Sequence, residues 1–212
     1  MTTRNLLTLV QWLSPSFPTG AYAYGQGLEA AISAGDIGSA ATCRDWLAAV
    51  LRHGSGLTDA VLVCHAMAPD ADLGALADLA DALAPGAERL RETREMGHAF
   101  ARTVSALTGQ TLPPLPYPVA VGVAARGLGL DRELVATLYL AAFAANLVQV
   151  AVRFVPLGQT EGQGILADLH PVIETTVRHA AELDLHDIGS ATLRADLASL
   201  SHETMETRIF RT

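Results

Sequence analysis

Apolar residues recur every three or four positions along most of this 212-residue chain, as on the buried face of amphipathic helices. No run alternates between apolar and polar residues for long enough to predict a strand, and no segment repeats another. Prolines and glycines divide the pattern, because proline lacks the amide hydrogen and glycine lowers helix propensity. The predicted helices cover residues 6–13, 24–34, 40–53, 57–67, 70–84, 86–107, 118–128, 131–154, 159–182 and a last stretch from 192 into the tail.

This pattern predicts an all-α fold, a single-domain bundle of about ten helices that spans residues 1–212. Ser39 is a suitable N-cap for the third helix, since its hydroxyl can accept an amide hydrogen of the first turn. Four prolines between Leu112 and Pro118 predict an extended connector. The last residues, from about 200 to 212, are expected to form a docking tail.

The segment Leu134–Val155 is apolar enough to raise the question of a membrane span. At ~1.5 Å per residue its length is roughly 33 Å, close to the thickness of a bilayer core. Its second half, however, contains Asn146, Gln149 and Arg153, and no basic cluster flanks it. A helix at the centre of a bundle is also apolar on all sides, so we interpret this segment as core.

Charge and residue usage exclude several functions. The formal net charge of -8 argues against nucleic acid or anionic membrane as a partner, because both attract a basic surface. All 14 basic residues are arginine, so a P-loop NTPase and a Schiff-base enzyme, which both need lysine, are excluded. No secretory signal is visible, and Cys43 and Cys64 lack metal or redox spacing. We expect two reduced, buried thiols in a cytoplasmic protein that binds other proteins.

Catalytic motifs are weak in this chain. Gly25, Gly27 and Ala30 match the end of a dinucleotide fingerprint, but a proline-rich loop precedes them instead of a strand. His202 and Glu203 begin like a zinc-protease helix, yet Glu206 stands where the second histidine is required. No G-x-S-x-G turn is present either. The sequence therefore predicts neither an enzyme nor a bound cofactor.

Three blocks have a more specific pattern: SPSFPTGAYAYGQGLE at 14–29, VPLGQTEGQ at 155–163 and SLSHETMETRIFR at 199–211. In their order and spacing these blocks resemble the urease accessory protein UreF family, and they span essentially the full chain. The family's all-α fold agrees with the helices predicted above. The resemblance implies a usually dimeric chaperone subunit that is not itself an enzyme.

What the resemblance implies is a bridging role in urease maturation. Members of this family bind the accessory protein UreD, also called UreH, and the pair recruits the GTPase UreG to apo-urease for nickel insertion. The UreF subunit is thought to couple GTP hydrolysis to metal transfer. By similarity, Tyr22 and Arg208 match positions that face the GTPase, and 209–211 match a segment ordered against UreD. The implied partner-binding residues are Tyr22, Tyr24, Glu29, Gln159, His202, Arg208, Ile209, Phe210 and Arg211.

The residue types in these blocks suit protein docking. A tyrosine buries a rigid ring while its hydroxyl still finds a partner, and an arginine can bind a carboxylate through two hydrogen bonds. Prolines in the first loop lower the entropic cost of binding. Tyr22 and Tyr24 could equally pack against the first helix as core residues, and the sequence leaves this open.

Two further hypotheses and one expected absence follow. Arg208 or Arg211 could act as an arginine finger, which would make the chain a GTPase-activating protein for UreG. A pocket between helices could hold a small molecule, although no polar cluster in the sequence points to one. Some UreF proteins bind metal through a histidine and a cysteine near the last helix, but here His186 is followed by Gly189 instead of cysteine. We therefore predict no tight metal site.

Overall fold

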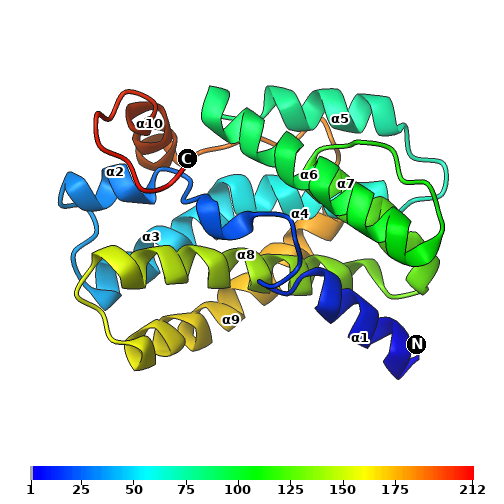
Figure 1. Cartoon of the computed structure of the whole chain (residues 1–212), viewed down its shortest axis with the longest axis horizontal. Coiled ribbons are helices and arrows are strands. Elements are labelled where there is room, and N and C mark those ends of the chain that lie inside the picture. Colours follow the sequence, from blue (N-terminus) through cyan, green and yellow to red (C-terminus); the bar gives the residue numbers. More distant parts are fainter. Residues whose placement is uncertain (1) are drawn as a thin grey trace.

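A computed structural model describes residues 2–212 of the chain. Within this range the protein is all-helical, with no strand, and forms one bundle (Figure 1). The elements are α1 Thr3–Trp12, η1 Ala21–Ala23, α2 Leu28–Ser33, α3 Ala40–His53, α4 Ser55–Ala66, α5 Leu73–Ala82, α6 Ala87–Thr108, α7 Tyr117–Ala125, η2 Arg126–Leu128, α8 Arg132–Phe154, α9 Gln159–Glu182 and α10 Leu193–His202, where η marks a 3₁₀-helix.

The predicted fold class is confirmed, and most predicted helices lie within a few residues of their observed bounds. Ser39 caps α3 as expected, since its hydroxyl accepts the amide hydrogen of Thr42 at 3.3 Å. The proline-rich connector contains no helix before Tyr117. Its backbone lies against α6, where the position of an added Cβ on Gly97 is 1.9 Å from the carbonyl oxygen of Leu115. Only glycine allows this close contact.

Two helix predictions are wrong at their ends. The segment predicted as one helix from Tyr24 is non-helical over residues 24–27 and becomes helical only at Leu28, where α2 begins, because Gln26 and Gly27 both have positive φ values. The last helix ends at His202, so the tail does not continue it. The backbones of these two segments hydrogen-bond to each other at Gly25 and Arg211, where helical turns would otherwise satisfy them.

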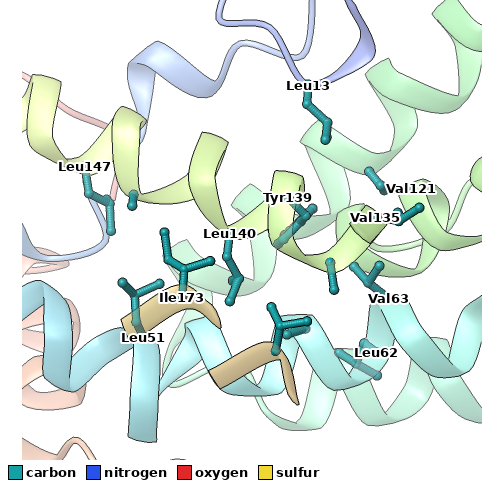
Figure 2. Packing of buried hydrophobic residues seen from close by; sticks show 14 of the residues in the cluster. Leu13, Leu51, Leu62, Val63, Val121, Val135, Tyr139, Leu140, Leu147 and Ile173 are labelled. Atoms are coloured by element: carbon teal, nitrogen blue, oxygen red, sulfur yellow. The ribbon is translucent and has the colours of Figure 1, made fainter. Parts of the chain in front are cut away.

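The centre of the bundle is α4, whose residues are almost all buried. It contacts α7, α8 and α9, and α8 and α9 pack along each other. Leu62 and Val63 of α4 belong to the same core cluster as Val135 and Leu140 of α8 (Figure 2). A helix enclosed on all sides must be apolar on all sides, which explains why α4 shows little helical periodicity.

Two helical stretches, 40–66 and 132–154, are long and apolar enough to cross a membrane. Within the bundle 72% of the most apolar window of the first and 50% of that of the second are buried. The first is also broken into α3 and α4 at Gly54. This packing is typical of core helices in a bundle.

The two cysteines have the predicted environment, since both are buried and neither is paired. Burial raises the pKa of each thiol, Cys43 and Cys64, to about 11. Both therefore stay protonated and unreactive near neutral pH.

Candidate partner-docking surface

The first loop, residues 14–27, leads from α1 to α2 across α8 (Figure 1). Its last turn is fixed by Gly27, which has a φ of 75°. A Cβ on this glycine would lie 2.5 Å from the backbone nitrogen of Ser199 in α10. Both the left-handed conformation and the contact therefore require glycine, and they place the loop directly against the last helix.

Gln26 has the same left-handed conformation without being glycine, with a φ of 51°. Its backbone amide donates to Thr212 Oγ1 at 3.1 Å, and its Nε2 donates to Glu92 Oε1 at 3.0 Å. Its Oε1 accepts a hydrogen bond from the Ser55 hydroxyl at 3.0 Å. A strained residue needs surroundings that determine its conformation, and here these contacts come from the tail, α6 and α4.

The tail, residues 203–212, folds back onto the first loop and α2. Glu29 Oε2 accepts the backbone amides of Ile209 at 3.1 Å and Phe210 at 3.0 Å. The amide of Arg211 donates to the carbonyl of Ala23 at 2.8 Å, and the amide of Gly25 donates to the carbonyl of Thr212 at 3.0 Å. The tail thus runs beside α2 and the first loop (Figure 1).

His202, at the end of α10, is fully buried between two carboxylates. Its Nδ1 lies 2.7 Å from Glu88 Oε2, and its Nε2 lies 3.4 Å from Glu29 Oε2. Arg208 forms an ion pair with the same Glu88. Removing one member of such a buried group leaves the others without partners, so this set fixes the start of the tail to α2 and α6.

A second charged cluster lies on α4, α6 and α8. Arg89 pairs with Asp59 at 3.1 Å and with Glu92 at 3.1 Å, and Tyr139 donates to Asp59 at 2.7 Å. The Thr212 hydroxyl donates to Glu92 Oε2 at 2.9 Å. Burial raises the pKa of both carboxyls, Asp59 and Glu92, and the shared Arg89 guanidinium lowers it only in part.

We call the tail contacts with the first loop, α2 and α6 the polar seam. Its outer side carries exposed side chains: Tyr22 is 66% exposed and Ile209 is 72% exposed. Arg211 is exposed as well, with only a 3.4 Å contact to Glu95. The seam therefore exposes a tyrosine from the first loop and an isoleucine and an arginine from the tail. Buried side chains hold the backbone of both segments in place.

The predicted site residues lie in different environments. Tyr22, Arg208, Ile209 and Arg211 are exposed, whereas Glu29, His202 and Phe210 are buried within the seam. Tyr24 is buried and donates to Glu95 at 2.7 Å, and burial raises its pKa to about 12. Gln159 begins α9, is exposed and forms no hydrogen bond with the tail among residues 2–212.

These positions resolve the alternative left open for the two tyrosines: Tyr24 packs inside and Tyr22 does not. Phe210 packs on Phe154, with ring centroids 5.3 Å apart, and the Arg153 guanidinium lies 5.9 Å from the Phe210 ring centre. Direct binding of a partner by Glu29, His202 or Phe210 would require the tail to leave this position. Their docking role stays a prediction.

Sequence reasoning missed residues of the first loop, the bundle and the end of the tail that hold the seam together. These are Gln26, Asp59, Glu88, Arg89, Glu92 and Thr212. One signal was available, since Glu88, Arg89 and Glu92 are spaced to share one face of α6 with buried Met96 and Phe100. Charges on the apolar face of a helix indicate buried ion pairs.

No group of three or more histidine, cysteine, aspartate or glutamate side chains in the described part of the chain could hold a metal ion. His186 is exposed and lies beyond the end of α9. The prediction that the protein has no tight metal site remains to be tested by titration.

Comparison with known proteins gives a consistent result. The UreF family model matches residues 37–170, more than half of the chain. A urease accessory protein UreF from Cereibacter sphaeroides is 61% identical over 209 residues, covering 99% of both chains. The UreF proteins of Dinoroseobacter shibae, 53% identical over 97% of this chain and 98% of the relative, and of Rhodopseudomonas palustris, 46% identical over 97% and 92%, also match.

The full-length relatives extend the match beyond the family model, which includes neither the first loop nor the tail. The first loop and most of the tail therefore lie within the region that the Cereibacter sphaeroides relative shares with this chain. The resemblance seen in three separate blocks of sequence and the all-helical fold agree with this match. The chain belongs to the UreF family of urease accessory proteins.

Proposed function

We propose that this chain is the bridging subunit of a urease-maturation complex. It binds UreD (UreH) and the GTPase UreG on apo-urease, and it couples GTP hydrolysis to nickel insertion. It acts by docking and has no enzymatic activity of its own. It acts in the cytoplasm as a homodimer. Light scattering of the purified protein measures the mass of this dimer.

The observation that carries this proposal is the polar seam. Residues from opposite ends of the chain form one surface, with Gly25 and Thr212 joined across 187 positions. Exposed tyrosine and arginine, here Tyr22 and Arg211, are residue types that often dominate the binding energy of protein interfaces. The exposed Ile209 adds apolar area to the surface. Because buried groups already hold their backbone, little ordering entropy is lost when a partner binds.

Substitution on this surface tests the proposal. Tyr22→Asp and Ile209→Asp place a charge on the surface without touching the buried anchors, so we expect the chain to fold and to lose capture of UreD or UreG. Leu107→Asp is the matched control, because Leu107 is 59% exposed on α6 and far along the helix from the seam. Copurification with co-expressed UreD, UreG and apo-urease is the measurement. Unchanged capture by both seam variants would contradict the proposal.

The arginine-finger alternative depends on which arginine is free. The Arg208 guanidinium is bound to Glu88, whereas Arg211 is exposed and only weakly held. A finger role for Arg208 would first require its ion pair with Glu88 to break. Arg211→Ala is therefore the sharper test: loss of UreG turnover with UreG binding intact favours the finger, since such an arginine can contribute roughly 10³–10⁵ in rate. Loss of binding itself favours docking.

A further inference from the structure

The outer face of α6 carries a line of basic side chains. Arg91, His98 and Arg102 are exposed and follow one another at spacings of seven and four residues, which places them on one face of the helix. This face lies opposite the buried side of α6, where Met96 and Phe100 pack into the bundle. At ~1.5 Å rise per residue the line is roughly 16 Å long. We call Arg91, His98 and Arg102 the basic stripe.

The two arginines of the basic stripe have no acidic partner within the chain. Their neighbour Arg94 binds Asp81 at 2.6 Å, and Arg89 is buried in an ion-pair cluster. None of the ion pairs that α6 forms with residues 2–212 includes Arg91 or Arg102. Because the formal net charge of the chain is -8, carboxylates are in excess, and yet none lies against these arginines.

One carboxylate lies beside the stripe, and it has partners of its own. Glu95 is one turn along α6 from Arg91, accepts the Tyr24 hydroxyl at 2.7 Å and lies 3.4 Å from Arg211. A nucleic acid whose phosphates followed the whole stripe would pass over this carboxylate and be repelled by it. The negative net charge acts in the same direction, so the stripe does not suit nucleic acid.

An acidic helix fits the stripe better. The stripe follows the helical repeat, so carboxylates at the same spacings on a second helix come to lie opposite it when the two helices pack side by side. Ala99 is half-buried and Ala106 is exposed beside the stripe, and such small side chains allow the helix axes to approach. Each arginine can then bind a carboxylate through two parallel hydrogen bonds.

We propose that the basic stripe docks an acidic helix of a partner protein, with carboxylates of that helix bound to Arg91 and Arg102. Exposed ion pairs are individually weak and are screened by salt, so the stripe contributes orientation and association rate more than affinity. The stripe meets the polar seam at Glu95, which contacts Arg211, so one partner can lie on both surfaces. The inference goes beyond the proposed function, and its test needs neither UreD nor UreG.

Two alanine-based peptides, long enough to form a helix, serve as probes. In the first, four glutamates share one face at spacings of four, three and four residues, which fits the stripe in either direction. In the second, the same four glutamates are spread around the helix. We expect the first peptide to shift the NMR signals of α6 amides saturably in the isotope-labelled full chain, and the second to bind about tenfold more weakly, since each exposed ion pair contributes only a few-fold.

Variants of the stripe test its location. Replacing both arginines, Arg91→Gln with Arg102→Gln, should weaken the first peptide to the level of the second, whereas Arg91→Lys with Arg102→Lys should keep most of the affinity because the charges remain. Arg4→Gln with Arg178→Gln is the matched control, since both arginines are exposed outside α6 and the change in net charge is the same. At about 0.1 M salt, where distant charges are screened, it should leave the affinity unchanged. Circular dichroism checks that each variant folds.

Three results would overturn the proposal. The first is equal binding of the two peptides, or unchanged affinity when both stripe arginines are glutamine. The second is loss of the dimer in that variant by light scattering, because the occupant would then be a second copy of the chain. The third is tighter binding of a single-stranded oligothymidylate than of the first peptide at the same amides, which would identify nucleic acid as the occupant. None of these results bears on capture by the seam, so the two proposals fail separately.

Discussion

The core around α4 and the polar seam hold the chain together by different means. In the core, α4 is buried almost entirely by apolar contacts with α7, α8 and α9. In the seam, the tail is held mainly by carboxylates, amides and a buried histidine, with Phe210 as its one large buried apolar side chain. Apolar burial depends little on pH, whereas each seam contact depends on a specific charge or donor.

This difference separates stability from function. Loss of a core side chain should affect the whole bundle, because the helices share one cluster. Loss of a seam contact should release the tail while the helices stay folded, since local openings need much less free energy than global unfolding. The seam is therefore the part of the fold that can be altered without loss of the scaffold.

The largest effect is expected in the core, from Phe100→Ala. Phe100 is fully buried, and its ring contacts Phe17 and Tyr117, with each pair of centroids 5.7 Å apart. The lost contacts and the cavity left behind should lower the free energy of unfolding by about 3–5 kcal/mol. Denaturant unfolding measures this change. Leu107→Ala, on the exposed side of the same helix, should stay within about 0.5 kcal/mol of the wild type.

A smaller and more local effect is expected from Glu29→Gln. The neutral amide is a weaker acceptor for the amides of Ile209 and Phe210, and it leaves His202 with one carboxylate instead of two. Hydrogen exchange of these two amides should become about 10- to 100-fold faster, as expected for loss of a charge-assisted contact. Amides of α4 should keep their protection.

Glu174→Gln is the matched control for that variant, because Glu174 is exposed on α9 and belongs to no ion pair among residues 2–212. It should leave the exchange of the tail unchanged. Equal protection of Ile209 and Phe210 in the wild type and in Glu29→Gln would show that the charge of Glu29 does not hold the tail.

The buried acids should make the contribution of the seam to stability depend on pH, unlike that of the apolar core. Burial raises the pKa of Glu92 above its ordinary value of 4.5, so the folded chain keeps a proton there at pH values where the unfolded chain has lost it. This contribution favours the folded state fully below pH 4.5 and is lost as the pH rises through the raised pKa. The sign is opposite to that of an ordinary salt-bridged carboxylate.

Urea unfolding at a series of pH values measures this contribution by comparing the wild type with Glu92→Gln. The difference in unfolding free energy, wild type minus variant, should decrease as the pH rises from 4.5 through the raised pKa. Phe100→Ala, a core variant, should shift stability by a similar amount at each pH. A difference for Glu92→Gln that increased with pH would mean that Arg89 outweighs burial at this site.

The sequence predicted the helices much better than the seam. Helical periodicity and proline positions were enough for α9, whose predicted and observed bounds are the same. These two signals failed at Gln26, whose backbone is left-handed. Nothing in the neighbouring sequence indicates this conformation, because the contacts that stabilise it come from Thr212, Glu92 and Ser55, far along the chain. The same holds for Glu29, whose partners are 180 and 181 residues away.

The candidate site was predicted in part, as residues and not as a structure. Three sequence blocks identified Tyr22, Ile209 and Arg211, which are exposed on two segments that the fold joins through the Arg211 amide and the Ala23 carbonyl. Exposure could not be predicted for Tyr22 and Tyr24, which are two residues apart in the same loop. Their difference arises from Glu95 and Asn146, which bind the side chain and backbone of Tyr24 from α6 and α8.

The smallest effect on stability is expected from Arg211→Gln. This variant distinguishes the buried residues that anchor the tail from the exposed residues of the seam. The Arg211 side chain is 68% exposed and its contact with Glu95 is 3.4 Å long, and exposed pairs of this kind contribute at most about 1 kcal/mol. Its backbone amide, which bonds Ala23, is unaffected by the substitution. We therefore expect unchanged tail protection in hydrogen exchange and weakened capture of UreG or UreD. If tail protection fell as far as in Glu29→Gln, exposed charges would hold the tail as strongly as buried ones, and the distinction between anchors and docking residues would be lost.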